Sequence, residues 1–430
     1  MGPEQPGRTD TWAPGRLTVK SVAVADPGDL ASLLPDRESL ACIRRGEGLV
    51  GWGTAAAITL PAGHDRFATG EKWLRELFDT ARVTDEVGLP GTGPVAFGSF
   101  TFDPASDGSV LVVPSVIVGR HGGSAWMTTI EADAAPGGRP AGEPVLRDPR
   151  PLGSPAPVRW SDGHLTPPQW EQAVAAAVSA IAAAQLRKIV LALDLNATAP
   201  QEFDSRVLLT RLVDRYPDCY TFACAGLVGA TPELLIRRSG LSVQSLVLAG
   251  TTPRGGTQAA DDALGAALLA SAKDQDEHSY AVDDVRAALR PLCADLRVED
   301  RPSLLRLANV QHLATEVHGQ LDEGEARTQS ALALAAALHP TAAVCGTPAE
   351  TAMDLIRELE GMDRGRYGGP VGWVDARGNG EWAIALRCAE LSGNQARLFA
   401  GSGIVAGSDP AAELAEAQTK FWPMRYALEG

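Results

Sequence analysis

Short apolar runs separated by turn residues fill the first third of the sequence. The runs LACIRR, GLVGWGTAAAITL, GPVAFGSFTFD, SVLVVPSVIVGR and AWMTTIEA are typical of neighbouring antiparallel strands, so they predict a β-rich part over residues 19–133. One helix, over residues 70–81, is expected between the second and third runs. Residues 1–18 are rich in proline, glycine and polar side chains, which predicts a disordered tail.

The pattern changes at a proline-rich segment. Nine prolines lie among small and polar residues between positions 134 and 168, which predicts a surface linker. On composition alone this segment divides the chain into two domains, with the chemistry in the second part, over residues 165–427. A helix over residues 168–185 is then expected to lead into an apolar strand that begins at Lys188.

Ionisable residues interrupt the apolar strands of this second part. Lys188 opens the strand KIVLAL, where its side chain either reaches past the strand end to water or is desolvated and acts as a base. Glu233 follows Thr231 and Pro232 between two apolar strands, so it is either an ordinary surface turn residue or a buried proton donor with a raised pKa. His312 lies in a strand-like run and is expected to be a hydrogen-bonded core residue.

Carboxylates three residues apart occur on two predicted helices, one over residues 261–289 and one that begins near residue 410. Residues at this spacing share one face of a helix. Two such faces indicate a magnesium site between the helices, because Mg²⁺ uses one or two carboxylates together with ligand oxygens and water. A neighbouring histidine, His278, is expected to form a hydrogen bond and not to bind this hard cation. The four carboxylates are Asp274, Glu277, Glu413 and Glu416.

A glycine-rich stretch before the second helix strengthens this interpretation. Gly401, Gly403 and Gly407 predict a turn whose backbone amides approach an anion closely. An anion beside paired carboxylates requires a cation between them. The alternative is a solvated helix face on which Glu416 and Lys420 form an ordinary ion pair.

Composition narrows the function classes. A chain of 430 residues is long enough for two or three domains or for one large α/β unit. The net charge of −15 argues against nucleic acid or an anionic membrane as the main partner. The six cysteines form no CxxC pair, no run of 18 apolar residues occurs and the first residues lack a signal-peptide pattern. These features predict a reduced, cytoplasmic location.

Nine motifs in order along the chain resemble those of the chorismate-utilising enzymes: KIVLA, GATPELL, LAGTTPRG, SAKDQDEH, VQHLATEVHG, LHPTAAVCGTP, GRYGGPVGW, IALR and AGSGIVAGSDPAAELAEAQTK. This family includes isochorismate synthases, salicylate synthases and the large chains of anthranilate and aminodeoxychorismate synthases. The resemblance implies an α/β (α+β) fold with two large antiparallel β-sheets flanked by helices, which bind Mg²⁺ and chorismate. It also implies a single catalytic domain over residues 19–430, in place of the two domains that the proline-rich segment suggests.

The resemblance also implies roles for individual residues. Members that add water to chorismate have lysine at the position of Lys188, whereas members that use ammonia have glutamine, since only a lysine can deprotonate water. By this likeness Lys188 is the general base and Glu233 is the general acid. Glu277 and Glu416 match the Mg²⁺ ligands, supported by Glu413 and Asp274. The implied substrate-binding residues are Thr251, His339, Thr341, Tyr367, Arg387, which lies in a predicted strand, Gly401, Gly403 and Lys420.

The implied reaction is the isomerisation of chorismate to isochorismate, by addition of water at C2 and loss of the C4 hydroxyl. Two departures from the family pattern leave alternatives open, because Leu193 and Thr252 stand where arginines are usual. A salicylate synthase would also eliminate pyruvate, an aminodeoxychorismate-type synthase would need a glutaminase subunit, and a degenerate chain would only bind chorismate. We expect a monomer or weak homodimer without a glutaminase subunit. The sequence leaves menaquinone and siderophore pathways equally open.

Overall fold

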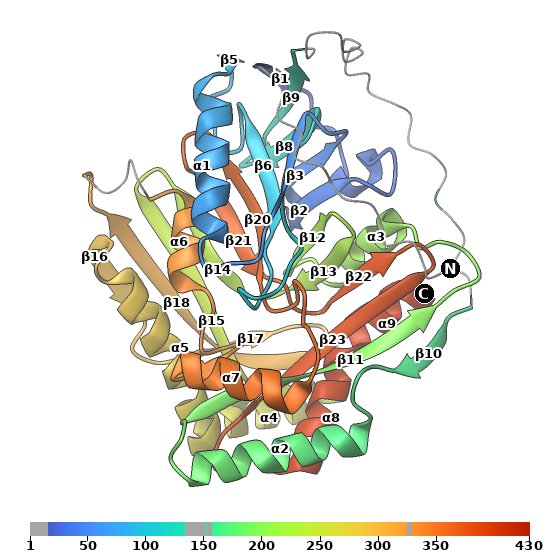
Figure 1. Cartoon of the computed structure of the whole chain (residues 1–430), viewed down its shortest axis with the longest axis vertical. Helices are drawn as coiled ribbons and strands as arrows, with labels where there is room; N and C mark the ends of the chain where they lie inside the picture. The colour runs from blue at the N-terminus through green and yellow to red at the C-terminus, as the bar shows by residue number, and fades with distance from the viewer. Residues whose placement is uncertain (1–15, 134–151, 153–156, 325–328) are drawn as a thin grey trace.

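Two large β-sheets, paired almost entirely in antiparallel fashion, form the protein, and helices pack against both (Figure 1). The structure is a computed structural model that describes residues 16–133, 152, 157–324 and 329–430. The mixed fold with two antiparallel sheets confirms the expectation from the family resemblance. None of the helices in these ranges has the length and apolar character needed to cross a lipid bilayer.

The first sheet has 13 strands within the described residues. Its strands, in spatial order, are β10 (Arg159–Asp162), β11 (Lys188–Thr198), β23 (Gln395–Ile404), β22 (Cys388–Ser392), β13 (Leu227–Thr231), β12 (Tyr220–Cys224), β2 (Leu40–Arg44), β3 (Glu47–Trp52), β8 (Val116–His121), β9 (Ser124–Ala132), β1 (Leu17–Val24) and β5 (Arg82–Asp85), while β19 (Gly346–Thr347) pairs with β11.

The second sheet has 10 strands within the same ranges. Its order is β16 (Cys293–Val298), β18 (Val310–Leu321), β15 (Ser242–Pro253), β14 (Leu234–Ser239), β21 (Gly380–Ile384), β20 (Pro370–Asp375), β6 (Val95–Ser99), β7 (Ser109–Val113) and β4 (Ala56–Leu60), while β17 (Ser303–Arg306) pairs with β18. Both sheets contain strands from before and after the proline-rich segment, so this segment does not separate two independent sheets.

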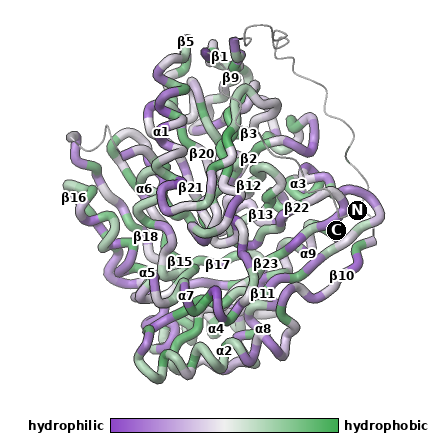
Figure 2. The backbone as a smooth tube through the Cα atoms, in the orientation of Figure 1, coloured by the Kyte–Doolittle hydropathy of each residue, from purple (hydrophilic) through white to green (hydrophobic). Residues whose placement is uncertain are grey.

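The helices are α1 (Arg66–Asp79), α2 (Pro167–Ala182), α3 (Ser205–Arg215), α4 (Gln258–Ala270), α5 (Ala272–Leu289), α6 (Ala331–Leu338), α7 (Ala349–Glu360), α8 (Pro410–Lys420) and α9 (Trp422–Glu429), with a short 3-10 helix at Leu30–Leu33. Figure 2 shows hydrophilic and hydrophobic residues alternating along α1, as expected for a helix with one buried face. The predicted helix over residues 70–81 therefore exists but begins earlier, at Arg66.

The prediction of one helix over residues 261–289 is wrong. The chain forms α4 and then α5, because Ser271 leaves the helical conformation and its side chain accepts a hydrogen bond from the backbone N–H of Asp274. A serine that caps a helix in this way starts a new helix. The break gives α5 its own direction, along which Glu277 is carried towards the sheets.

The ends of the predicted tail and linker are also wrong. Strand β1 begins at Leu17, so the tail cannot reach residue 18, and residues 1–15 lie outside the described residues. Within the predicted linker, residues 159–162 form β10, which pairs with β11, and α2 begins at Pro167 with a capping box between Thr166 and Gln169. Residues 134–151 and 153–156 lie outside the described residues.

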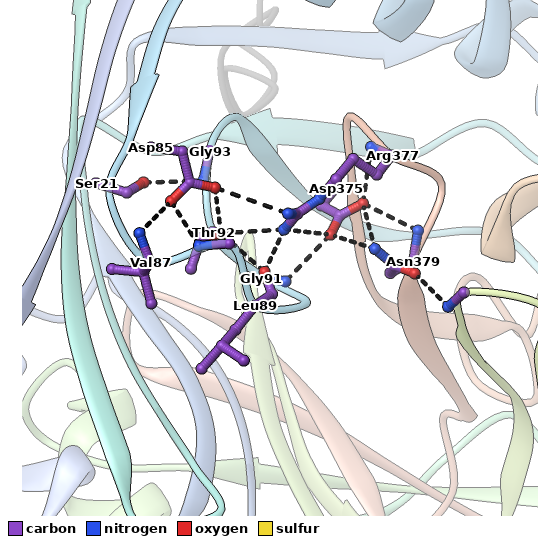
Figure 3. A network of polar contacts seen from close by, with 12 residues as sticks. Ser21, Asp85, Val87, Leu89, Gly91, Thr92, Gly93, Asp375, Arg377 and Asn379 are labelled. Atoms are coloured by element: carbon purple, nitrogen blue, oxygen red, sulfur yellow. Dashed lines mark hydrogen bonds and ion pairs between the residues drawn. The ribbon is translucent and has the colours of Figure 1, made fainter.

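A network of hydrogen bonds ties the β5–β6 loop to the β20–β21 hairpin, and we call it the Asp375 network (Figure 3). The Asp375 carboxylate accepts hydrogen bonds from the backbone N–H groups of Gly91, Arg377 and Asn379. The Asn379 amide donates to it as well, at 3.0 Å, and Arg377 lies 3.7 Å from the Asp85 carboxylate. Because β5 belongs to one sheet and β20 and β21 to the other, this network joins the two sheets.

Candidate active site

A pocket opens where the two sheets meet, and we call it the central pocket. It is bordered by β11, β15, β18, β23, the turn before β14 and the two helices α5 and α8. The ionisable or hydroxyl side chains on its wall are Glu233, Thr251, Glu277, His312, Arg364, Tyr367, Arg387, Glu416 and Lys420. Seven of these nine come from the predicted site, so sequence motifs more than 150 residues apart converge on one cavity.

Two of the chemical groups stand where the chain passes from one sheet to the other. Glu233 lies between β13 of the 13-stranded sheet and β14 of the 10-stranded sheet (Figure 1). Arg387 lies between β21 and β22, which also belong to different sheets. The prediction that a strand carries Arg387 is wrong, because this residue has a left-handed backbone with φ of 48°. The two crossings place an acid and a cation at the seam between the sheets.

Lys188 is completely buried, which rules out a side chain that reaches water at a strand end. Its Nζ lies 3.3 Å from Glu277 Oε1 and forms an ion pair with it, but has no hydrogen-bond partner within the described residues. Lys188 does not itself border the central pocket; it lies directly behind the pocket wall formed by Glu277 and Gly403. A buried amine with so little stabilisation is a candidate base.

Glu233 is 4% exposed, so the alternative of a surface turn residue is wrong. Burial raises the pKa of Glu233 to about 8, although the charges of Lys188, Arg387 and Lys420 act in the opposite direction. A carboxyl group with this pKa carries a proton at neutral pH. The structure therefore provides a proton donor on the wall of the central pocket.

The carboxylates Glu277 and Glu416 face each other across the central pocket from α5 and α8. Burial raises the pKa of Glu277, and the charge of Glu416 adds to this effect while Lys188 opposes it. Burial also acts on Glu416, but the ion pair with Lys420, at 2.6 Å, outweighs it and lowers the pKa of Glu416. Two largely desolvated carboxylates that repel each other fit a divalent cation completed by ligand oxygens and water.

The other two predicted metal supports do not reach the central pocket. Glu413 is held on α8 by Lys273, at 2.8 Å, and by Ser402 Oγ at 2.5 Å. Asp274 stands in the first turn of α5, against Gly250. In the described ranges no group of three or more histidine, cysteine or acidic side chains is arranged around a common metal position. Of the four predicted carboxylates, Glu277 and Glu416 border the pocket, and Ser402 contacts both Glu416 and Glu413.

The predicted glycine turn is wrong for two of its three residues, since only Gly407 lies in a turn. Gly401 and Gly403 lie inside strand β23 and pair with Ala192 and Val190 of β11. A Cβ at Gly401 would lie 2.9 Å from the Tyr367 hydroxyl, and a Cβ at Gly403 would lie 2.0 Å from Glu277 Oε1. Glycine is therefore required because side chains from other elements occupy the space, and not because the backbone turns around an anion.

Cationic and aromatic groups also border the central pocket. Within the described residues the guanidinium of Arg387 makes no hydrogen bond, and burial lowers its pKa from the usual value. Tyr367 stacks on Phe399 with ring centroids 5.1 Å apart. Lys420 donates a hydrogen bond to the Gly401 carbonyl at 2.8 Å. A buried arginine without a protein partner is a ready site for a carboxylate.

The sequence analysis predicted that His312 is a core residue, but His312 borders the central pocket. Its Nδ1 lies 3.2 Å from Thr251 Oγ1 and 3.3 Å from the Gly250 carbonyl, whereas its buried Nε2 has no partner among the described residues. The bulge at Gly250 in β15, which has φ of 76°, brings Thr251 opposite His312. Thr251 therefore lies in the pocket as predicted, and His312 accompanies it.

Two predicted substrate-binding residues lie outside the central pocket. His339 is partly buried and its Nε2 contacts the Phe102 carbonyl at 3.0 Å. Thr341 is buried, its hydroxyl has no partner within the described residues, and Asp284 holds its loop through the backbone N–H of Ala342. The pocket wall receives Ala343 and Val344 from this loop instead. His278, as expected, forms a hydrogen bond, from Nε2 to Thr315 Oγ1 at 2.7 Å.

The two departures from the family pattern also lie away from the central pocket. Leu193 packs in the hydrophobic core and Thr252 lies at the edge of β15 opposite Gln311. One pocket residue that the sequence analysis missed is Arg364, whose neighbours GRYGG attracted attention only for Tyr367 and the glycines. An arginine in a turn-rich stretch gives no sequence signal that distinguishes a buried side chain from a surface one.

The family model of chorismate binding enzymes matches residues 42–429, which is most of the chain. The chain belongs to this family. The isochorismate synthase DhbC of Bacillus subtilis is 42% identical over 273 residues, which are 61% of this chain and 68% of that protein. The isochorismate synthase MenF of the same organism is 35% identical over 382 residues, 84% of this chain and 80% of that protein.

A solved structure agrees with these relatives. MenF, the menaquinone-specific isochorismate synthase of Escherichia coli, has a TM-score of 0.78 and 25% identity, and the match covers 97% of this chain and 95% of that one. The likeness extends across both sheets, including the N-terminal strands for which the sequence motifs were weakest. This member of the chorismate binding enzymes therefore carries the family fold over nearly its whole length.

Proposed function

We propose that the protein is an isochorismate synthase, an isomerase that converts chorismate to isochorismate. The observation that carries the proposal is the pairing of Lys188, a buried amine with no hydrogen-bond partner in the described residues, with Glu233, a buried acid whose pKa is raised to about 8. A reaction that removes a proton from water and gives one to a hydroxyl needs one group of each kind. The relatives named above support the same activity.

The proton transfers balance. In its neutral form Lys188 accepts a proton from the water that forms the new C–O bond at C2, and Glu233 gives its proton to the C4 hydroxyl, which leaves as water. The ring double bonds shift between these two carbons, so the substrate and product have the same composition. Gly403 has no side chain, so the space between Lys188 and the central pocket stays open for Nζ to approach the substrate.

The dianionic substrate needs cations at both ends. Arg387 is placed to bind one carboxylate, next to Tyr367. Glu277 and Glu416 would hold a Mg²⁺ ion, which supplies positive charge for the other carboxylate. The largely buried Lys420 already neutralises part of the charge of Glu416 in this structure.

The competing reactions make different products from the same substrate. A salicylate synthase would eliminate pyruvate from isochorismate, and an ammonia-using enzyme would deliver an aminated ring. Lys188 disfavours amination, because a base is needed for water but not for free ammonia.

All six cysteines are free, which supports a reducing, cytoplasmic location for the enzyme.

The test is incubation of the purified protein with chorismate and Mg²⁺, with and without ammonium, followed by chromatographic separation of products. Isochorismate in both incubations is the expected result. Salicylate with equimolar pyruvate would move the protein to the lyase branch. An aminated product would refute the role of Lys188, and unchanged chorismate would refute the activity.

A further inference from the structure

A buried ion pair contributes its arginine to the wall of the central pocket. Arg364 and Glu360 have side-chain exposures of 2% and 0%, and Arg364 Nε donates to Glu360 Oε2 at 2.9 Å. Arg364 Nη2 makes a second contact with the other carboxylate oxygen, so the pair is bidentate. The Arg364 guanidinium also lies over the Phe102 ring, 4.3 Å from its centroid. Nothing in the proposed chemistry uses these two charges.

The ion pair of Arg364 and Glu360 bonds to β11 along the part of one edge that no strand in the described ranges covers. On one edge of β11, β19 pairs only with Lys188 and Ile189, and β10 pairs from Leu195 onwards. Between them, Arg364 Nη2 donates to the Val190 carbonyl at 2.7 Å, and the backbone N–H of Ala192 donates to Glu360 Oε1 at 2.7 Å. The Val190 carbonyl and the Ala192 N–H on this edge are therefore satisfied by side chains, whereas the Val190 N–H donates to the backbone carbonyl of Cys345 at 2.8 Å.

Arg364 also binds the loop that follows Thr341. Its Nη1 donates to the Val344 carbonyl at 2.9 Å, in the loop that follows Thr341. Val190 and Val344 both border the central pocket. One rigid guanidinium thus bridges the strand that carries Lys188 and this loop, beside the backbone hydrogen bond from the Val190 N–H to the Cys345 carbonyl.

The donors of Arg364 are directed to the protein. Its guanidinium makes four hydrogen bonds, to the two Glu360 oxygens and to the carbonyls of Val190 and Val344. Five N–H groups are available in arginine, so only one is left, and a bidentate grip on a substrate carboxylate is excluded. Arg387, not Arg364, is the arginine that can bind the substrate.

We propose that Arg364, held by Glu360, is a positioning residue that sets the place of Lys188 relative to Glu233. The proposal rests on the proposed function, because positioning has a consequence only if Lys188 acts as the base. A lysine at position 364 keeps the charge but replaces the planar fork by a single nitrogen, which cannot contact both carbonyls and both carboxylate oxygens. The strand and the loop then lose the bridge that the guanidinium makes between them, and the backbone hydrogen bond from Val190 to Cys345 holds them less rigidly.

The experiment compares Arg364→Lys with the matched variant Arg366→Lys. Arg366 lies two residues away and is also largely buried, but it donates to Glu390, Ser99 and the Cys224 carbonyl and does not border the central pocket. Both variants lose the same chemical group from a buried network. For each variant, kcat for chorismate is measured at a temperature well below the melting temperature of that variant. Chorismate binding is measured separately, with each substitution combined with the inactivating Glu233→Gln.

The expected result is a split between rate and binding. Arg364→Lys should lower kcat by about 10- to 100-fold while chorismate Kd changes by less than about threefold, because small misplacements of a reacting group slow the chemical step. Arg366→Lys should leave kcat close to that of the wild type. A wild-type kcat in Arg364→Lys, or equal losses of kcat in the two variants, would overturn the proposal.

Hydrogen exchange tests the positioning without relying on turnover. Peptides covering residues 186–193 and 341–346 should exchange faster in Arg364→Lys than in Arg366→Lys. Unchanged exchange in both segments would overturn the proposal even if kcat fell. If the wild-type enzyme leaves chorismate unchanged, the proposed function fails, and the exchange comparison alone still decides whether Arg364 fixes β11.

Discussion

The central pocket and the Asp375 network both bury charged groups, but they treat them in opposite ways. In the network the Asp375 carboxylate accepts hydrogen bonds from three backbone N–H groups and from Asn379 (Figure 3). In the central pocket Nζ of Lys188 and Nε2 of His312 are buried without hydrogen-bond partners within the described residues. A buried polar group without a partner lowers stability. The pocket therefore keeps groups ready for a ligand at the expense of stability, whereas the network stabilises the junction of the sheets.

The two regions should consequently respond to mutation in different measurements. Removing a group from the central pocket should affect the reaction more than the fold. Removing a group from the Asp375 network should affect the fold and leave the chemistry intact at temperatures where the protein stays folded. Four substitutions examine this contrast, and they follow in order of decreasing expected effect.

Lys188→Gln should give the largest effect. Loss of a general base typically lowers the rate by about 10²- to 10⁴-fold, and glutamine cannot accept a proton from water. The melting temperature should stay close to that of the wild type, because Nζ makes no hydrogen bond in the described part of the chain. Isochorismate formation by chromatography and thermal unfolding measure the two quantities. Lys20→Gln, at an exposed lysine of β1, is the control, and wild-type turnover in Lys188→Gln would remove the proposed base.

Asp375→Ala should reverse the pattern. The change leaves several buried N–H donors without an acceptor and removes one of the two carboxylates that lie near Arg377 in the described residues, which should lower the free energy of unfolding by about 3–5 kcal/mol. At a temperature below its own unfolding transition the variant should keep kcat within about twofold of the wild type, because distant effects on chemistry are small. Denaturant unfolding and product formation provide the readouts.

The control for this substitution is Asp354→Ala, because the Asp354 side chain is 71% exposed and pairs only with Arg357 in the described structure. Its effect on stability should be small, as for most surface ion pairs. Equal destabilisation by the two substitutions would mean that the Asp375 network is not a special stabilising feature. A large loss of kcat in Asp375→Ala would mean that the two regions are not independent.

The comparison also explains which parts of the structure the sequence predicted. Strands with one buried face follow alternating or continuous apolar runs, so most β-strands and the helices α1, α2 and α8 were expected near their observed places. The residues at chain crossings, Glu233 and Arg387, were found because local motifs carry them. The break at Ser271 was missed because helical periodicity continues through it, and only the cap reveals it.

The errors in the predicted site have a common physical cause. Gly401 and Gly403 looked like turn glycines. Glycine is required at these positions because Tyr367 and Glu277, which belong to other elements, occupy the space of a side chain. His312 looked like a core residue, because the bulge at Gly250 that brings Thr251 opposite it lies 62 residues away. Such contacts between distant segments leave no trace in local residue patterns.

Glu233→Gln should change the pH dependence of both activity and stability. In the folded protein the pKa of Glu233 is about 8, above the usual value of 4.5, so the acid form persists up to about pH 8. The folded state binds this proton more tightly than the unfolded state, so its stabilising contribution is complete below about pH 4.5 and is lost as the pH rises to 8. The wild type should therefore lose stability between about pH 4.5 and pH 8, and lose general-acid activity as Glu233 ionises near pH 8.

The glutamine variant cannot ionise at this position. The melting temperature of the variant minus that of the wild type should rise between about pH 5 and pH 8. The turnover of the variant should be low at every pH. Thermal unfolding at a series of pH values gives the first quantity. A difference that stays constant across this pH range would mean that Glu233 is not the buried acid, whatever its effect on the rate.

Gly403→Ala should give the smallest of the four effects. It tests directly whether the pocket wall at Gly403 must stay open for Lys188. The new Cβ would lie 2.0 Å from Glu277 Oε1 and 3.3 Å from Lys188 Cε, so Glu277 must move and the path of Lys188 to the central pocket narrows. A tenfold loss of kcat/KM, equivalent to about 1.4 kcal/mol, is expected. Gly407→Ala is the control, because a Cβ at Gly407 would have no atom of the described residues within 4 Å. If the two alanine variants had equal kcat/KM, Gly403 would not be the opening through which Lys188 meets the substrate.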